Sequence, residues 1–487
     1  MTTDPSISLM IVAYLAAVVL FGWFTMKRAS KSEEGYLAAG RSLGAIAGGF
    51  AFASTYSSAS AFMGSLGAIA LLGFSFAAWV NIFVIGMMVF MAFLIAPHLR
   101  RTGLLTVPDF YSNRYGDAFR VISAAITAII MWVYLVAQVK AMGLIASDVL
   151  GIDYGIGVWV ALAFVAYVVL GGMYATILTS VLQEVMMLAT AFLVTGAIFL
   201  KMGWEGSVVA GSAAAPYLFS VAGKPGPVFG WSFGLIVFLG SLAMPHLAMR
   251  VYSSADERVA RQTVALGAIL TSALYAVMFA VPAALIALKI KLVDPDLALM
   301  GLAGRLLPAP LIGLVAASIL AAAMSTTDAQ LMTAGSAIVH DIYYKVIHRG
   351  AAIPLGRTIL LNRLVMLALG LAAILVAISP PGLIVLIMGL AMAIAAGSLL
   401  VPLLGGIWWR RGNEAGSIAA ALGGLATVLA LHPMALGGAL GVRLPSPHFA
   451  GLYAVAASAI LYAVVSLATG PPSEEKVRFF EKMHGKA

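Results

Sequence analysis

Long apolar segments recur along the whole chain and set the strongest limit on its fold. A helix of about 20 apolar residues crosses the hydrocarbon core of a bilayer, and thirteen such segments can be read in the sequence. Because only helices and closed barrels satisfy their backbone hydrogen bonds in lipid, the sequence predicts an all-α polytopic membrane protein. The predicted spans lie at about 8–26, 43–70, 74–97, 121–147, 156–171, 180–200, 231–250, 263–288, 309–339, 358–378, 382–408, 415–431 and 449–469.

The amino-acid composition supports this fold class and argues against several classes of function. Of the 487 residues, 62% are hydrophobic and 10% charged, whereas a soluble domain carries about 25% charged residues. The first apolar segment lacks a preceding basic region and is long enough to span, so we expect it to be retained rather than cleaved. The absence of cysteine excludes disulfides and thiolate sites. No paired-histidine metal motif or nucleophile elbow indicates an enzyme.

The positive charges predict the orientation. Most of the 28 Lys and Arg, including Arg114, Arg120 and Arg250, fall in alternate connections and in the C-terminal tail. The positive-inside rule then places the N-terminus outside and the C-terminus in the cytoplasm, in a plasma (inner) membrane. The basic net charge therefore reflects topology, and we expect no nucleic-acid partner. The opposite connections hold Lys201, Lys224, Lys289, Lys291, Arg305 and Arg443.

The spacing of the predicted spans indicates an internal repeat. Spans that begin near 43, 74 and 121 match spans near 231, 263 and 309, and two further spans follow each trio. Because five is an odd number, the two units are inverted, which is typical of secondary transporters. The predicted organisation is 1–42 first span and cytoplasmic loop, 43–201 first five-helix repeat, 202–230 extracellular loop, 231–409 second five-helix repeat, 410–470 two peripheral helices and 471–487 cytoplasmic tail.

The leading span of each repeat contains a helix-breaking stretch. "FASTYSSASAFMGSLG" (52–67) is rich in Gly and Ser, and "GSLAMPHLAMR" (240–250) contains Pro245. Such stretches unwind helices, and the freed carbonyls need a partner, either protein or a bound ion. The alternative is that the small residues serve close helix packing. Their matched positions in both repeats favour a site.

A polar cluster interrupts the ninth predicted span, in "AAAMSTTDAQL" (321–331). Ser325 and Thr326 offer two adjacent hydroxyls, and a hard cation such as Na⁺ prefers oxygen ligands. Carbonyls from the break in 52–67 could complete the coordination shell. The alternative is that both hydroxyls bond to carbonyls one turn earlier in their own helix.

Motifs along nearly the whole chain resemble the sodium:solute symporters. They are "EEGYLAAGRSLG" (33–44), "YSSASAFMGSLG" (56–67), "YLVAQ" (134–138), "GGMYATILTSVLQ" (171–183), "MPHLAMRVY" (244–252) and "AAAMSTTDAQL" with "SAIVHDIYY" (321–344). The resemblance implies 13 transmembrane helices in the LeuT-like inverted-repeat fold. It also implies a sodium site of backbone oxygens and hydroxyls at Ser54, Ser57, Ala322, Ser325 and Thr326. The family often has aspartate where this chain has Ser180, so we expect one Na⁺ per cycle.

The same resemblance suggests the solute. The motifs at 134, 171 and 244 are similar to those of monocarboxylate carriers such as the acetate permeases, so we expect symport of an acetate-, pyruvate- or lactate-type acid without an obligate protein partner. The alternatives are a sodium symporter for a proline-like amino acid or pantothenate, a proton-coupled carrier, and a solute-binding membrane sensor. We expect the solute to contact Tyr56, Ser58, Tyr134, Gln138 and Met244.

Four ionisable residues within the spans are further candidates, because such residues are costly in a bilayer. Lys140 could pair with a substrate carboxylate or extend to the outer headgroups. Asp328 could line the inner vestibule or the ion's exit path. His246 could carry a proton or hydrogen-bond the helix break, and Glu184 is expected to reach polar surroundings near the cytoplasmic end.

Overall fold

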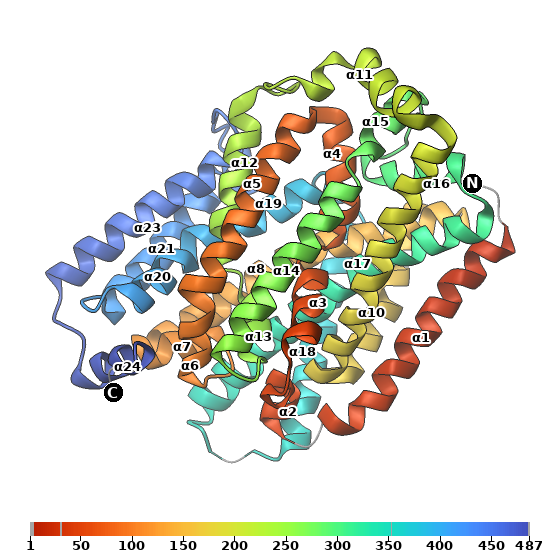
Figure 1. The fold of residues 1–487 in the computed structure, drawn as a ribbon. Helices are drawn as coiled ribbons and strands as arrows, with labels where there is room; N and C mark the ends of the chain where they lie inside the picture. Colours follow the sequence, from red (N-terminus) through yellow and green to blue (C-terminus); the bar gives the residue numbers. More distant parts are fainter. Residues whose placement is uncertain (1–3, 30–31, 352, 486–487) are drawn as a thin grey trace.

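The helices pack side by side in a tilted bundle (Figure 1). The computed structural model describes residues 4–29, 32–351 and 353–485; within these ranges, the side chains of 21–29, 33, 167–172, 174 and 175 are outside the description. No strand is present in the described ranges. The N-terminal α1 (Pro5–Ala29) lies on one flank, and α21 (Glu414–Leu431) with α23 (Phe449–Ala468) lies on the other (Figure 1).

The long helices meet the requirement for crossing a membrane. Within the described residues, 9 helices are long and apolar enough, or up to 11 if each of two bent pairs counts as one span. The predicted all-α polytopic class is thus confirmed, but the count of thirteen is not. The fifth and sixth predicted spans, for example, both reach into α10 (Ala161–Trp204). Other long elements are Phe74–Thr102, α8 (Asp117–Leu150), Glu257–Ala287, Ala309–Ile347, α18 (Leu355–Ala377) and Ile384–Trp408.

Both predicted helix breaks are confirmed. The first separates α3 (Ala45–Tyr56) from Ser60–Leu72, with a bend of 58°. The second separates α12 (Pro227–Leu242) from α13 (Pro245–Tyr252), with a bend of 43°. Proline at the first position of α13 has no N–H to donate, which suits a helix start and ends the preceding hydrogen-bond ladder.

Two elements form the centre of the bundle. In Ala309–Ile347, which begins with α17 (Ala309–Ser336), 78% of the most apolar window is buried inside the protein, and the same share is buried in Ile384–Trp408. In α18 the share is only 28%. The central position of α17 explains how hydroxyls and a carboxylate can lie within a span, since this helix faces protein rather than lipid.

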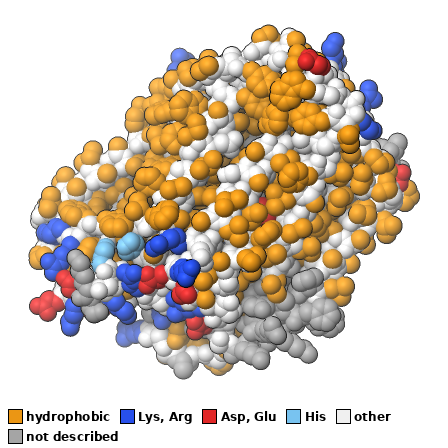
Figure 2. Space-filling view, viewed as in Figure 1, with side chains coloured by type: hydrophobic (Ala, Val, Ile, Leu, Met, Phe, Trp, Pro, Cys, Tyr) orange, Lys and Arg blue, Asp and Glu red, His pale blue; other side chains and the backbone are white. Residues whose placement is uncertain are grey.

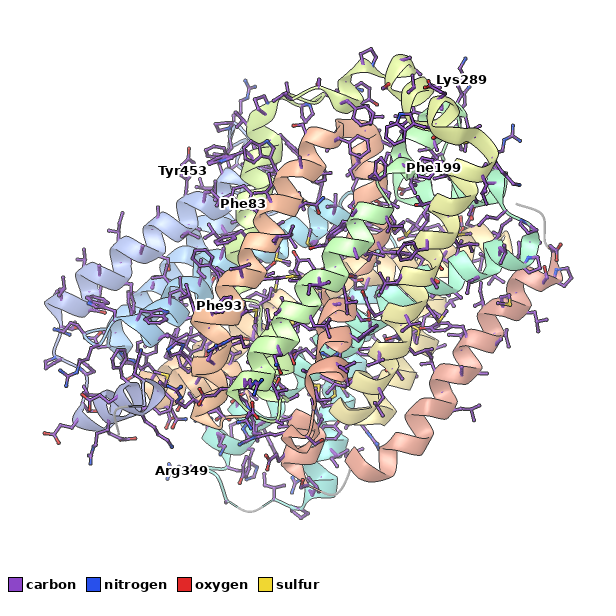
Figure 3. All side chains as sticks on the ribbon, in the orientation of Figure 1. Phe83, Phe93, Phe199, Lys289, Arg349 and Tyr453 are labelled. Atoms are coloured by element: carbon purple, nitrogen blue, oxygen red, sulfur yellow. The ribbon has the colours of Figure 1, made fainter. Side chains whose placement is uncertain are left out.

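We call the end of the bundle with α2 (Glu33–Ala38), α7 (Val107–Arg114) and α24 (Glu474–Met483) the lower end, and the end with α11 (Ala210–Ala214) and α16 (Ala298–Leu306) the upper end (Figure 1). Hydrophobic side chains cover most of the visible face, whereas charged side chains gather towards both ends (Figure 2). Lys289 marks the upper end and Arg349 the lower end (Figure 3). This distribution suits a protein that is surrounded by lipid at mid-height.

Candidate functional site

The hydroxyl pair on α17 lies against the end of α3. Ser325 Oγ donates to the Ser54 carbonyl at 2.9 Å, and Thr326 Oγ1 donates to the Thr55 carbonyl at 3.1 Å. Both hydroxyls also lie near the Ala322 carbonyl, at 3.1 and 3.3 Å. The bonds across to α3 are therefore shorter than the bonds within α17. Three carbonyls and two hydroxyls converge at one place, which is a donor set that suits a hard cation such as Na⁺.

Four of the five predicted sodium ligands thus come together, and Thr55 joins them without having been predicted. Ser57 ends α3, where its N–H donates to the Ala53 carbonyl at 2.7 Å. The hydroxyl of Ser57 is buried without a partner among the described residues, so the part of its carbonyl in the site stays a prediction.

Gln138 on α8 hydrogen-bonds the backbone at the first break. Its Oε1 accepts a hydrogen bond from the Ala59 N–H at 3.2 Å. Ser58 N–H turns back to the Tyr56 carbonyl at 2.8 Å, and the helix starts again at Ser60. Gln138 was predicted to contact the solute, but here it satisfies one of the backbone groups that the break leaves free.

A cavity of about 310 Å³ adjoins the first break. Tyr56, Ser58 and Tyr134, which we expected to contact the solute, line this cavity, and the Ser58 and Tyr134 hydroxyls form a hydrogen bond of 2.8 Å. Gln138 and Met244 are not among its lining residues. The lining continues to Ile69, Phe74 and Phe219, so the cavity runs from the breaks towards the upper end. None of the described lining residues carries a carboxylate, an ammonium or a guanidinium group.

His246, the second residue of α13, also lines this cavity. Its ring stands edge-on to the Tyr134 ring, with centroids 5.9 Å apart. The side chain is 2% exposed, and Nδ1 has no hydrogen-bond partner among the described residues. The interpretation of His246 as a hydrogen-bonded residue of the break therefore finds no support at this nitrogen. In the sequence, the preceding Pro245 indicated that His246 lies at a helix break.

Lys140 occupies neither of the two environments considered from the sequence. Its ammonium contacts Asp296 Oδ2 at 2.7 Å and Asp294 Oδ2 at 3.3 Å, and it donates to the Gly382 carbonyl at 3.1 Å. Asp296 also accepts from the Ile384 N–H at 3.1 Å. Burial raises the pKa of Asp296, and the charge of Lys140 opposes that rise. Lys140 thus joins three segments near the upper end.

Arg250, which we assigned to a connection, is instead completely buried. Its Nε donates to Thr55 Oγ1 at 3.0 Å, and an NH₂ group donates to Ser180 Oγ at 3.2 Å. Asp328 is a carboxylate whose charge interacts with this guanidinium over a longer distance than an ion pair. Asp328 is completely buried, and neither of its oxygens has a hydrogen-bond partner in the described part of the chain.

Glu184 also differs from expectation. The side chain is completely buried instead of reaching polar surroundings, and both carboxylate oxygens lack a partner among residues that the structure describes. Ion pairs and hydrogen bonds depend on tertiary contacts, so the chain position of Glu184 alone could not predict this environment.

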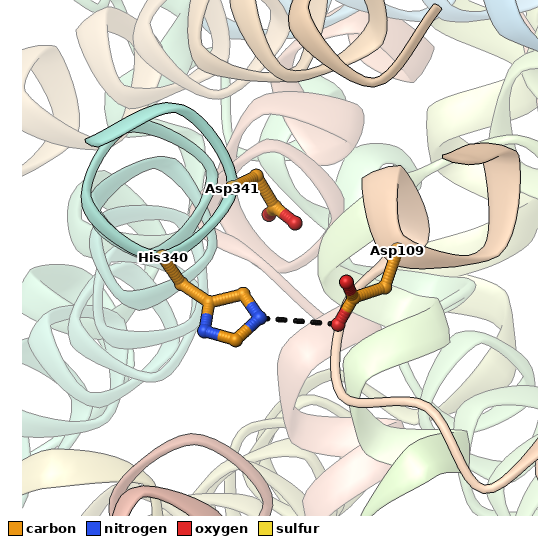
Figure 4. A group of neighbouring side chains, drawn as sticks. All are labelled: Asp109, His340 and Asp341. Carbon is orange, nitrogen blue, oxygen red and sulfur yellow. Dashed lines mark hydrogen bonds and ion pairs between the residues drawn. The ribbon is translucent and has the colours of Figure 1, made fainter. Parts of the chain in front are cut away.

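A second polar cluster, drawn in Figure 4, includes Asp109 of α7, a helix of the lower end. Ligand atoms of Asp109, His340 and Asp341 lie within 4.8 Å of one another, a spacing compatible with a metal ion. However, Arg120 donates to Asp109 at 2.6 Å and lies 3.6 Å from Asp341, so its charge already offsets the two carboxylates. Burial by itself raises the pKa of Asp109, but the hydrogen bond from His340 and the nearby positive charges outweigh it and lower the pKa. This cluster is best described as an ion-pair network that joins α7, α8 and the end of the α17 span.

Several known transporters are similar to this chain. The model of the sodium:solute symporter family matches residues 36–424. The high-affinity proline transporter PutP of Bacillus subtilis is 28% identical, over 94% of this chain and 97% of its own length. The monocarboxylic acid transporter of Corynebacterium glutamicum is 25% identical, over 88% and 83%. Among solved structures, the outward-open, substrate-bound state of a Na⁺-coupled sialic acid symporter matches with a TM-score of 0.81 at 20% identity, covering 96% of this chain and 99% of that one.

Proposed function

Since the chain belongs to the sodium:solute symporter family, we propose that it uses the entry of Na⁺ to import a small monocarboxylate of the acetate, pyruvate or lactate type by alternating access. The observation that carries this proposal is the contact of the Ser325 and Thr326 hydroxyls with the carbonyls of Ser54 and Thr55. A cation that loses its water at this point is offered replacement oxygens from two different helices.

The ion site and the solute cavity share the end of α3, which provides the coupling. The Thr55 carbonyl belongs to the ion site, while the next residue, Tyr56, lines the cavity. When Na⁺ binds, the two hydroxyls turn their hydrogens away from the carbonyls, so that hydroxyl and carbonyl lone pairs both coordinate the ion, and the ion fixes α3 against α17. Because Na⁺ then favours one arrangement of the break, it also favours the cavity shape that accepts the solute.

The orientation follows from the charges. With the lower end in the cytoplasm, as the arginine-rich connections favour, the cavity is reached from the outside of the cell membrane. One Na⁺ that enters down about 100 mV gains about 2.3 kcal/mol, and a tenfold gradient adds about 1.4 kcal/mol. A monoanion that moves with one Na⁺ carries no net charge, so only the second term drives its accumulation.

The cavity lining favours an acid over an amino acid. Ser58, Tyr134 and His246 supply donors for a carboxylate, whereas no described lining residue supplies a carboxylate for an ammonium group. Proline remains the second candidate solute, because PutP aligns over nearly the whole chain.

The test is uptake into proteoliposomes. Labelled acetate, pyruvate, lactate, pantothenate and proline are offered with an inward gradient of sodium or of choline. We expect sodium-dependent uptake of a monocarboxylate without electrical current. Sodium-dependent uptake of proline or pantothenate alone would replace the solute assignment, and an inward current with a monocarboxylate would contradict the one-to-one stoichiometry. Uptake that ignores sodium but follows a pH step would identify a proton-coupled carrier, and binding without any uptake a sensor.

A further inference from the structure

We propose that His246 determines solute specificity: together with the Ser58–Tyr134 hydroxyl pair it binds the carboxylate of the solute, whose branched or aromatic tail fills the apolar remainder of the cavity. This inference rests on the proposed symport of a monocarboxylate, and it shifts the preferred solute from the acetate, pyruvate or lactate type to acids with a larger apolar body.

The first support is the unsatisfied imidazole. Buried polar groups in native structures are nearly always hydrogen-bonded, and each exception calls for an explanation. His246 Nδ1 is such an exception among the described residues, and its ring lines the cavity. Because Nδ1 is itself buried, the nitrogen that can meet a ligand in the cavity is Nε2, which carries the hydrogen in one of the two neutral tautomers. A carboxylate in the cavity would accept that hydrogen.

The second support is the position of His246 in its helix. Since α13 begins at Pro245 and the Leu247 and Ala248 N–H groups donate to the Met244 carbonyl, the His246 N–H and the positive end of the helix dipole lie at the break. A negative charge is favoured at such a helix start. The imidazole and the helix end therefore favour the same kind of ligand from the same side of the cavity.

The third support is the hydroxyl pair. Ser58 Oγ and Tyr134 Oη lie 2.8 Å apart, so one hydroxyl donates to the other. The second hydroxyl hydrogen is free to donate to a carboxylate oxygen. Because the Tyr134 ring also packs edge-on against His246, with centroids 5.9 Å apart, the two kinds of donor are held next to each other.

The rest of the cavity is built for an apolar group. Its volume of about 310 Å³ reaches the lower limit of pockets for drug-sized ligands, roughly 300 Å³, and an acid of two or three carbons leaves most of it unfilled. Burial of each added methylene improves affinity about fourfold. Apolar side chains that line this part of the cavity include Phe62, Phe233, Val385, Met388 and Met392.

Thermal unfolding of the detergent-purified protein measures binding without transport. We expect isovalerate and phenylacetate to raise the unfolding temperature at concentrations at least tenfold lower than acetate does, and isovaleramide to act far more weakly than isovalerate. In His246→Leu, the preference for isovalerate over isovaleramide should fall at least tenfold. His246→Gln, which keeps a donor, should retain part of it, and it replaces the leucine variant if that variant does not fold. The matched control is His432→Gln, a buried histidine outside the cavity lining.

An unchanged preference for the acid in a folded His246 variant, or equal potency of acetate and isovalerate, would overturn this proposal. Uptake measured in parallel separates it from the proposed function. If the acids stabilise the protein but no sodium-driven uptake occurs, the carboxylate site stands and the symport proposal fails. If sodium-driven uptake occurs and His246→Leu keeps its preference for the acid, only the specificity proposal fails.

Discussion

The two helix breaks look alike as bends, and each joins the end of one half-helix to the start of another, but the candidate sites lie at opposite kinds of helix end. At the first break α3 ends, so the carbonyls of Ser54 and Thr55 lie at the negative end of a helix. At the second break α13 begins, so His246 lies at a positive end. The difference teaches that the direction in which a half-helix points selects its ligand, a cation for carbonyl oxygens and an anion for nitrogen donors.

Arg250 connects the two breaks. Its guanidinium extends from α13 to the side chain of Thr55 at the end of α3, and it also reaches Ser180 on α10. A fixed positive charge bonded to Ser180 is compatible with our expectation of a single Na⁺. We therefore expect substitutions at one break to change either the sodium dependence or the solute KM, and loss of Arg250 to disturb both breaks.

The largest effect is expected from Arg250→Met, because this substitution removes the side chain that connects the two helix breaks. The substitution removes the charged donor of the hydrogen bonds to Thr55 and Ser180, at about 1.5–3 kcal/mol each, and it also removes a positive charge that acts on the buried Asp328. We expect a strong loss of thermal stability in detergent and of uptake, partly restored by adding Asp328→Asn. The exposed Arg305→Met serves as control. An Arg250→Met protein as stable as the parent would contradict the link.

The next largest effect is expected from a substitution that changes sodium binding at the first break without changing solute binding. Replacing both Ser325 and Thr326 by alanine removes two oxygens from the cation, at about 1 kcal/mol or more each. In uptake assays, we expect the sodium concentration for half-maximal rate to rise at least tenfold, while the KM for solute at saturating sodium changes little. Thr327→Ala removes a neighbouring buried hydroxyl that lacks a partner among the described residues, and it should leave both values unchanged. Equal shifts in the double variant and this control would refute the ion site.

Gln138→Leu tests whether the shape of the first break affects both sodium binding and solute binding. It leaves the Ala59 N–H without its acceptor, a loss of about 1–3 kcal/mol that falls on the geometry of the break itself. We expect the half-maximal sodium concentration and the solute KM to rise together by several fold. Gln330→Leu, which removes a buried amide with no partner among the described residues, is the control. A rise in solute KM alone would return Gln138 to direct contact with the solute.

The smallest effect is expected from Tyr134→Phe. It removes one hydroxyl of the pair with Ser58 but keeps the ring against His246. At about 0.5–1.5 kcal/mol for one hydrogen bond, the solute KM should rise about threefold or slightly more. The sodium dependence should not change, and a shift in it would show that the cavity and the ion site are not chemically separate.

Local sequence features were sufficient to predict the breaks, because Pro and stretches rich in Gly and Ser unwind a helix directly. The meeting of Ser54 with the α17 hydroxyls was predicted from the resemblance to a known family. Local features were not sufficient for the charges. Arg250 looked like a loop arginine and Lys140 like a lone cation, yet their partners lie far away in sequence, as Asp296 does for Lys140. Such pairings are set by how helices pack, which hydropathy does not encode.

The most direct test of the central claim is equilibrium binding of ²²Na⁺ to the purified protein and to the variant with alanine at both 325 and 326. If the oxygens of the first break and of α17 replace the water of a cation, the parent should bind about one ion per chain and the variant should lose that binding in the same concentration range. Saturable binding of equal affinity in both proteins would contradict the account.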